Sequence, residues 1–198
     1  MAASTDRGRT ASAIAGTSPA TAGQSVRQTG MMPERDGRER IESARAAPEV
    51  RLAEVTADNW RDVIALELNN DQRDLVASNL YSLAEAKFTP LARPRAIYAG
   101  TRLVGFLMYD LGDDDEPHRA SIYRFMIDRR HQRQGYGRAA LEKALDEIRA
   151  VPGIATVSIC YAPENQAKAL YARVGFMEIG RDEDGEVVAE LSIQKPSA

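Results

Sequence analysis

One stretch, Gln132-Arg133-Gln134-Gly135-Tyr136-Gly137-Arg138, lies between two patterned segments of this 198-residue chain. The apolar run from Tyr123 to Ile127 before it predicts a strand, and the pattern that begins at Ala139 after it predicts a helix. Glycines at such a turn let a ligand approach the backbone, and the first turn of a helix offers unpaired N–H groups. Because arginines lie within the stretch, it predicts a loop that binds an anion such as phosphate.

Two glycines alone also fit an ordinary helix-capping loop, so the rest of the sequence has to decide. The stretch lacks the third glycine of the dinucleotide fingerprint and the Gly-Lys-Ser/Thr end of a Walker loop. A second motif follows downstream and reads Asn165-Gln166-Ala167-Lys168-Ala169-Leu170-Tyr171-Ala172-Arg173-Val174-Gly175-Phe176.

Together the two motifs resemble the GCN5-related N-acetyltransferase (GNAT) family. The order Gln/Arg-x-x-Gly-x-Gly between a strand and a helix is similar to the family's acyl-CoA pyrophosphate loop. The second motif, an Asn followed by a Tyr and then Gly-Phe, resembles the family's later motif. The resemblance covers residues 49–193.

The composition narrows the class of protein. Apolar residues make up 43% of the chain, which is ordinary for a globular protein. A single cysteine, Cys160, excludes a disulfide framework, and two distant histidines argue against a zinc site, so we expect no metal. No apolar run approaches the roughly 18 residues of a membrane span, so we expect no membrane contact. The lone cysteine fits a reducing compartment, and we expect a cytoplasmic protein.

The charge is distributed unevenly. Residues 1–48 carry seven arginines and five acids, while residues 49–198 have a net charge of −5. The first segment has few large apolar groups, and we predict a disordered N-terminal extension over 1–48 followed by one domain over 49–198. A mildly acidic domain argues against nucleic acid as a partner and suits a cationic small molecule, although many proteins are this acidic for solubility alone.

The predicted fold class is α/β, with a mixed, mostly antiparallel central sheet and helices on both faces. The pattern orders a strand, two helices, three strands, a helix, a strand, a helix and two strands, which matches the order in the family. The expected strands are 50–55, 96–99, 103–110, 120–127, 156–161, 176–180 and 187–193. The expected helices run over 60–68, with Thr56 as N-cap, and over 78–88, 137–149 and 164–173.

The resemblance implies a set of residues that bind acetyl-CoA. Backbone groups of the strand before the loop would hold the pantetheine arm and the acetyl oxygen, and the loop would hold the pyrophosphate. The implied cofactor-binding residues are Phe125, Met126, Ile127, Gln132, Arg133, Gln134, Gly135, Tyr136, Gly137, Arg138 and Asn165. Asn165 could equally be the N-cap of the helix that follows.

Tyr171 matches the family's general acid, which gives a proton to the sulfur of CoA. A second explanation is open, because Ala167, Leu170, Tyr171 and Val174 lie on one helical stripe and packing alone accounts for an aromatic there.

Acetylation of an amine also needs a base, since an amine with pKa near 10.4 is neutral at about one part in a thousand at pH 7. Some family members carry an acid on the strand before the loop, but this chain has Tyr123 and Arg124 there. The candidates for base or substrate contact are Glu85, on the side of its helix opposite Leu80, Leu83 and Lys87, and Asp110 at a strand end. Each could instead be a solvated surface acid.

The acceptor is suggested by two segments, 81–88 and 123–128, which resemble bacterial spermine/spermidine (diamine) acetyltransferases. We therefore expect an enzyme that transfers acetyl from acetyl-CoA to a primary amine, with a polyamine such as spermidine or spermine favoured. Protein amines or antibiotic amines are the alternative acceptors, and a non-catalytic acyl-CoA-binding module is the alternative class. Tyr171 argues against such a module. The sequence leaves the oligomeric state open, a homodimer included.

Overall fold

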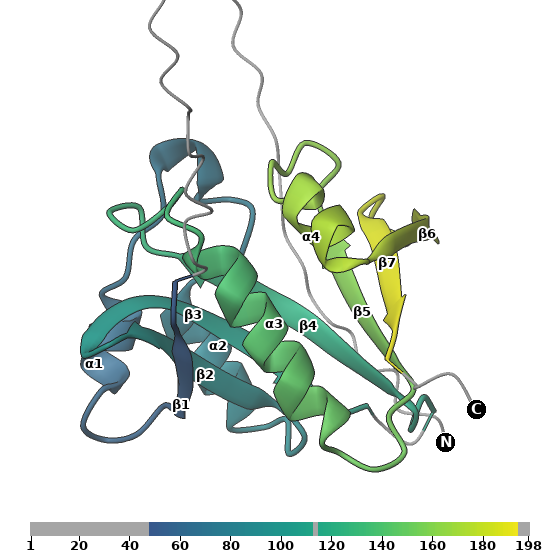
Figure 1. Ribbon diagram of the computed structural model, residues 1–198, viewed down its shortest axis with the longest axis horizontal. Helices are drawn as coiled ribbons and strands as arrows, with labels where there is room; N and C mark the ends of the chain where they lie inside the picture. The colour runs from purple at the N-terminus through teal and green to yellow at the C-terminus, as the bar shows by residue number, and fades with distance from the viewer. Residues whose placement is uncertain (1–47, 113–114, 194–198) are drawn as a thin grey trace, which may run out of the picture. The chain divides into compact units, whose positions relative to one another are not determined.

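The computed structural model describes residues 48–112 and 115–193. The predicted extension lies outside this range except for Pro48. In the described part, one seven-stranded sheet has the order β1-β2-β3-β4-β5-β7-β6 (Figure 1), and every neighbouring pair is antiparallel except β4 with β5. The predicted α/β class with a mixed sheet is confirmed. No helix within the described ranges has the length and apolar character needed to cross a membrane.

The helices and strands follow one another along the chain in the order that the sequence predicts, with one short additional 3-10 turn. The strands are β1 (Arg51–Glu54), β2 (Arg93–Ala99), β3 (Arg102–Asp110), β4 (Arg119–Ile127), β5 (Thr156–Tyr161), β6 (Met177–Arg181) and β7 (Val187–Ser192). The helices are α1 (Trp60–Ile64), the 3-10 turn η1 (Asn70–Gln72), α2 (Asn79–Ala86), α3 (Tyr136–Arg149) and α4 (Lys168–Val174).

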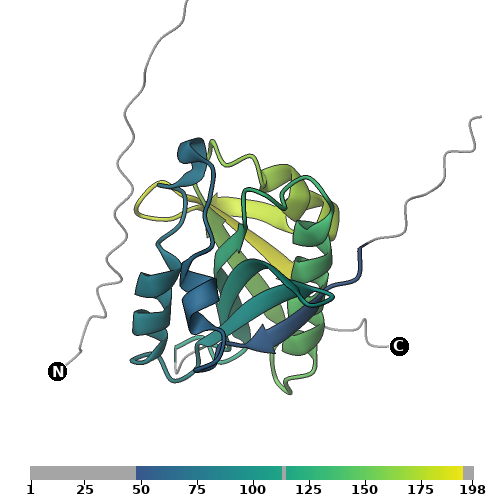
Figure 2. The ribbon, with the colours of Figure 1, turned by 90° about the vertical axis from the view of Figure 1, so that its left-hand side faces the viewer.

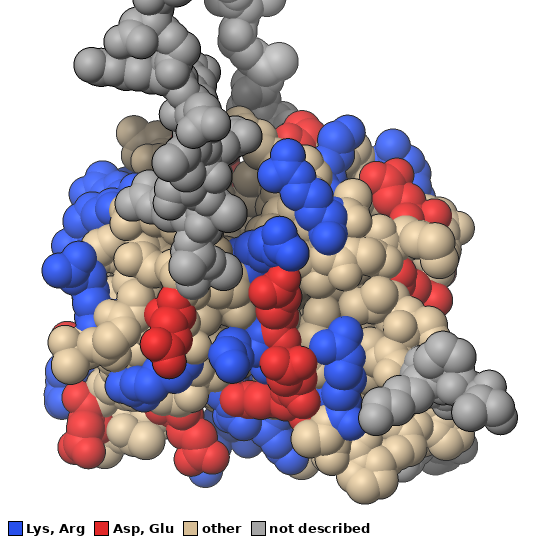
Figure 3. Space-filling model, viewed as in Figure 1, with Lys and Arg blue, Asp and Glu red and all other residues tan. Residues whose placement is uncertain are grey.

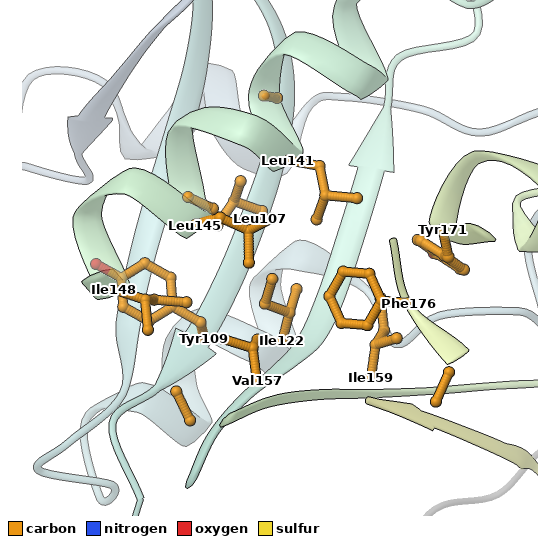
Figure 4. Close-up of a cluster of buried hydrophobic side chains, with 14 of the residues drawn as sticks. Leu107, Tyr109, Ile122, Leu141, Leu145, Ile148, Val157, Ile159, Tyr171 and Phe176 are labelled. Carbon is orange, nitrogen blue, oxygen red and sulfur yellow. The ribbon is translucent and has the colours of Figure 1, made fainter. Parts of the chain in front are cut away.

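The sheet separates two apolar layers, with α3 on one face and α1 and α2 on the other (Figure 2). Leu141, Leu145 and Ile148 of α3 are almost fully buried against sheet residues such as Leu107 and Val157 (Figure 4). Burying a side chain of this size stabilises a fold by about 1.5–3 kcal/mol. This packing fixes where α3 begins, and therefore where the glycine loop lies.

The first helix is shorter than its pattern predicts. It ends at Ile64 and its N-cap is Asn59, so both the extension to Leu68 and Thr56 as N-cap were wrong. The reason is tertiary: the backbone N–H of Glu67 donates to a carboxylate oxygen of Asp128 at 3.1 Å, and its C=O accepts from the N–H of Arg129 at 2.8 Å. Since both backbone groups of Glu67 bond to the segment after β4, the helical pattern cannot continue.

The second helix turns two polar residues inward beside Leu83. Ser78 is its N-cap and accepts from the N–H of Tyr81 at 3.2 Å. Its buried residues are Asn79 and Ser82, while Leu80 is 58% exposed. The amide of Asn79 donates to the C=O of Val63 at 2.8 Å, so a polar contact sets the orientation of this helix.

The two central parallel strands separate part of the way along their length. β4 pairs with β5 only from Arg119 to Ile122, and its register with β3 shifts at Tyr109, so that Tyr123 is an extra residue in β4. A bulge of this kind bends a strand. In the described structure, the rest of β4 pairs with β3 alone and the end of β5 pairs with β7 alone. Figure 1 shows the two strands diverging toward α4.

A buried carboxylate fixes the chain where β4 ends. Asp128 is fully buried and accepts four hydrogen bonds, from the N–H, Nε and Nη2 of Arg130 and from the N–H of Glu67, at 2.8–3.1 Å. Burial alone would raise the pKa of Asp128, but these hydrogen bonds outweigh it and lower the pKa to about 2. The carboxylate therefore joins the segment after α1 to the start of the glycine loop.

Replacing this carboxylate should weaken the fold in a pH-dependent way. Because its pKa is lower in the folded state, its charge stabilises the protein above about pH 4, and that stabilisation is lost as the pH falls toward 2. We expect Asp128→Asn to lower the free energy of unfolding by about 2 kcal/mol at pH 7. The gap from the unsubstituted protein, measured by urea unfolding, should narrow near pH 2.5.

The matched control is Asp146→Asn, which removes an exposed ion pair with Arg149. This change should alter the free energy of unfolding by only a few tenths of a kcal/mol, as is usual for exposed pairs. A stability gap for Asp128→Asn that stays the same between pH 7 and pH 2.5 would contradict the assigned role of the carboxylate.

Candidate functional site

A pocket of about 600 Å³ lies at the separation of β4 and β5. It is formed by the end of β4, the loop that follows, the start of α3, and the segment from Asn165 through α4. Ten residues singled out from the sequence line it: Phe125, Met126, Ile127, Gln132, Arg133, Gly135, Gly137, Arg138, Asn165 and Tyr171. The two sequence motifs thus meet at one site.

One glycine and one arginine of the loop adopt a backbone conformation that residues other than glycine usually avoid. Gly135 has φ +87° and Arg133 has φ +62°, both in the left-handed region. Gly135 is the N-cap of α3, and the first N–H bonded back to it belongs to Ala139, at 3.2 Å. The N–H groups of the first turn, from Tyr136 to Arg138, therefore have no partner within the helix and can donate to an anion.

Gly137 faces the pocket wall. A Cβ added there would lie 3.4 Å from Leu170 and 3.7 Å from Ile127 and Phe125, all pocket residues. A Cβ added at Gly135 would lie 3.0 Å from Pro48, just before β1. Because neither glycine has a Cβ, the backbone of the loop can lie close to Leu170 at Gly137 and close to Pro48 at Gly135.

The pocket is electropositive. Arg133, Arg138 and Arg173 line it, and no carboxylate is found among the lining residues that the structure describes. Figure 3 shows basic side chains gathered around the start of α3 and over α4. Arg138 contacts Glu142 at 2.8 Å and Arg133 reaches Gln166 at 3.4 Å, which orients two of the three guanidinium groups. This set of donors fits a phosphorylated ligand.

Gln132 holds the loop in place through its side chain. Its Nε2 donates to the C=O of Ile127 at 3.0 Å and to Gln72 at 2.8 Å, and its Oε1 accepts from Asn69 at 3.0 Å. It thus ties η1 to the end of β4.

Two loop residues lie outside the pocket lining. Gln134 donates to the C=O of Arg130 at 3.3 Å, and Tyr136 packs against the core beneath α3. The structure therefore gives their side chains local roles.

Tyr171 lies in the pocket although it is only 5% exposed. Its ring contacts Tyr161 and Phe176, with centroids 5.1 Å and 6.3 Å away. Burial, and then the proximity of Tyr161, raises the pKa of Tyr171, which keeps the hydroxyl protonated near neutral pH. No hydrogen bond of this hydroxyl is found within the described ranges, so both predicted roles, core packing and proton donation, fit its position.

Asn165 shapes the turn before α4. Its Oδ1 accepts from the N–H of Ala167 at 2.9 Å, while the residue also lines the pocket. α4 begins at Lys168 with Ala167 as its N-cap, so the predicted helix start at residue 164 and Asn165 as N-cap were wrong. The ligand-binding role predicted for Asn165 fits its place in the pocket lining.

The two candidate acids lie elsewhere. Glu85 on α2 forms an ion pair with Arg124 of β4 at 3.0 Å, and Arg124 is only 11% exposed. Asp110 lies opposite Ser121, whereas the pocket residue Met126 lies opposite Phe106, four positions earlier on β3. Neither acid lines the pocket. Glu85 contacts Arg124, which directly precedes the pocket residue Phe125 on β4, while Asp110 lies at the end of β3 away from the pocket.

Several pocket residues were not predicted. They are Leu68, Gln72, Leu75, Val76 and His131 on one side, and Gln166, Ala167, Ala169, Leu170 and Arg173 on the other. The second group lies within the Asn165–Phe176 motif, where helical spacing from Tyr171 could have found it. The first group comes mainly from the irregular chain between α1 and α2, which carries no pattern that points to a ligand.

No group of three or more His, Cys, Asp or Glu side chains in the described ranges is arranged to hold a metal ion.

Comparison with known proteins agrees with this geometry. Residues 54–176 match the acetyltransferase (GNAT) family. A curated relative, spermine/spermidine N(1)-acetyltransferase of Bacillus subtilis, is 29% identical over 145 residues, which are 70% of this chain and 95% of that protein.

Two solved structures share the fold. Spermidine N-acetyltransferase from Vibrio cholerae in complex with CoA and spermine aligns with a TM-score of 0.58 and 20% identity, over 73% of this chain and 94% of that one. An aminoglycoside acetyltransferase in complex with coenzyme A aligns with a TM-score of 0.62 and 14% identity, over 73% and 95% of the two chains. Since the family match spans more than half of the sequence, the chain belongs to the acetyltransferase (GNAT) family.

Proposed function

We propose that this enzyme transfers an acetyl group from acetyl-CoA to a primary amine, and that the acceptor is a polyamine such as spermidine or spermine. The observation that carries the proposal is that an anion-binding loop, an open strand edge and a buried tyrosine lie in one pocket. We place this reaction in the cytoplasm, in keeping with the single cysteine.

The residues present fit acetyl-CoA. The free N–H groups at the start of α3 and the three pocket arginines suit its phosphates. The edge of β4 released from β5 offers backbone groups to an extended amide-bearing arm, in the manner of an added strand. When bound, acetyl-CoA supplies an activated acetyl thioester.

The chemistry needs a proton for the departing sulfur. Tyr171 lines the pocket, its hydroxyl makes no hydrogen bond to another described residue, and its raised pKa means that the hydroxyl carries its proton at neutral pH. A backbone N–H on the open part of β4 would stabilise negative charge on the acetyl oxygen. The attacking nitrogen loses a proton when it forms the amide, and this proton would restore the hydroxyl of Tyr171.

The acceptor side is defined by α2 and the bulged part of β4. Glu85 brings a carboxylate to this side, but Arg124 already neutralises it. An ammonium group of the acceptor would therefore share Glu85 with a guanidinium. Because Arg124 already pairs with it, Glu85 would favour a positively charged acceptor only moderately. A protein amine or an aminoglycoside is therefore the second candidate acceptor.

The cofactor assignment is tested at Gly135. Gly135→Asp places a carboxylate at the start of α3, and we expect acetyl-CoA affinity measured by calorimetry to fall about tenfold or more, which corresponds to roughly 1.4 kcal/mol. Gly153→Asp is the control, because it imposes the same backbone strain at φ +91° with no atom within 4 Å of the new Cβ. Equal affinity in a folded Gly135→Asp variant would refute the loop assignment.

The proton donor is tested with Tyr171→Phe, which keeps the ring and removes the hydroxyl. If this hydroxyl protonates the sulfur, kcat should fall by roughly 10- to 1000-fold, near the usual range for general acid catalysis. Acetyl-CoA binding should change little. Unaltered turnover would leave Tyr171 with a packing role alone.

The acceptor is tested with Glu85→Gln and a panel of amines, with CoA release as the measurement. We expect the KM for spermidine to rise about fivefold, equivalent to roughly 1 kcal/mol, and the effect to shrink at high salt. The KM for a monoamine should not change, and a melting curve checks that the loss of the Arg124 pair has not unfolded α2. A lower kcat that recovers as the pH rises would identify Glu85 as a base instead. A clear preference of the unsubstituted enzyme for a peptide N-terminus or an aminoglycoside would reject the polyamine.

A further inference from the structure

The Tyr171 side chain comes from a short helix and depends on its neighbours for orientation. α4 has only seven residues, Lys168–Val174, and ends at Gly175 with φ +111°. Two aromatic rings contact Tyr171, with interplanar angles of 40° for Tyr161 and 69° for Phe176. Figure 4 shows Tyr171 and Phe176 together at the edge of the core cluster. Aromatic contacts of this kind contribute about 0.5–1.5 kcal/mol beyond burial.

Of these two neighbours, Tyr161 is held by a polar contact. It is 5% exposed, and its hydroxyl donates to Oε1 of Glu178 at 3.1 Å. Burial and the hydrogen bond to Glu178 raise the pKa of Tyr161 to about 12, so its hydroxyl remains a donor at neutral pH. The hydroxyl of Tyr161 is therefore directed to β6, while that of Tyr171 is left to the pocket.

The sheet fixes this contact on both sides. Tyr161 is the last residue of β5 and lies opposite Val187 of β7, beyond the point where β5 leaves β4. Glu178 lies on β6, opposite Ala189 of the same strand β7. A hydrogen bond between side chains of β5 and β6 thus spans β7 and holds the Tyr161 ring at the end of the separated strand.

We propose that Tyr161, anchored by Glu178, is a positioning residue that directs Tyr171 into the pocket for proton transfer. This inference rests on the role proposed for Tyr171 and goes beyond it, because Tyr161 does not line the pocket and acts only through the Tyr171 ring. Nothing in either sequence motif points to this pair.

The test removes each half of the hydrogen bond. Tyr161→Phe and Glu178→Ala should each lower kcat by about three- to tenfold, less than the roughly 100-fold cost of a displacement of 1 Å at a reacting group. The dissociation constant for acetyl-CoA should stay the same in both variants. Glu178→Gln keeps an oxygen that can accept the hydrogen bond, so its kcat should be close to that of the unsubstituted enzyme. The double variant Tyr161→Phe, Glu178→Ala should be no slower than either single variant, because both remove one interaction.

A second cycle shows whether Tyr161 acts through Tyr171. In the Tyr171→Phe background, Tyr161→Phe should cause no further loss of kcat. A full additional loss there, or unchanged kcat for Tyr161→Phe in the otherwise unsubstituted enzyme, would overturn the inference. If Tyr171→Phe itself has normal kcat, the proposed acid fails first, so the two failures are distinguishable.

The matched control is Tyr109→Phe. The hydroxyl of Tyr109 donates to Glu147 of α3 at 2.8 Å, and Tyr109 is 3% exposed, so a buried tyrosine again makes a partly buried contact with a glutamate, here away from the pocket. We expect it to lose stability to a degree similar to Tyr161→Phe, by about 1–3 kcal/mol in the free energy of unfolding, with normal kcat. A fall in kcat as large as that of Tyr161→Phe would show that the effect follows stability, and would reject a specific positioning role.

Discussion

The site depends on the early end of the ladder between the two parallel strands. β4 and β5 pair only from Arg119 to Ile122 on β4, and the extra residue Tyr123 then bends the strand away. A sheet that stayed paired would satisfy its own backbone groups and leave none for a ligand. β4 stays paired with β3, and β5 stays paired with β7, so the sheet remains intact although unpaired backbone groups are exposed between its two central strands.

An opened edge has to be supported, and buried polar contacts supply that support. Asp128 and Gln132, both just after β4, bond back to Glu67 and to Gln72 in the chain between α1 and α2. Their hydrogen bonds fix the direction in which the loop enters α3. Arg133 and Gly135 then adopt left-handed conformations that the loop requires. Hydrogen bonds of Asp128 and Gln132 therefore hold the pocket loop in place beside the apolar core of the sheet and α3.

The sequence predicted the strands, α3, α4 and the meeting of two motifs, because hydrophobic periodicity and glycine positions are local signals. The prediction failed where hydrogen bonds between segments that are distant in the sequence determine the structure. The pattern to Leu68 is helical, yet Asp128 and Arg129 take the backbone groups of Glu67. No pattern in α2 shows that Asn79 is buried and bonds to the C=O of Val63. No local signal could show that Arg124 is paired with Glu85, since the two residues lie on different elements.

The charges on the two sides of β4 differ in a way that bears on the reaction. The pocket is lined by three arginines, of which Arg138 is paired with Glu142, and by no described carboxylate, which suits a phosphorylated donor. The α2 side carries Glu85, whose charge Arg124 balances. A free carboxylate beside an amine would stabilise its ammonium form and oppose the loss of the proton that attack requires. A carboxylate that is already paired with an arginine attracts a polycation less, but it leaves the nitrogen of the acceptor amine easier to deprotonate. For the proposed acceptor, long-range attraction would then come from the net charge of −5 over residues 49–198 rather than from a single acid at the reacting nitrogen.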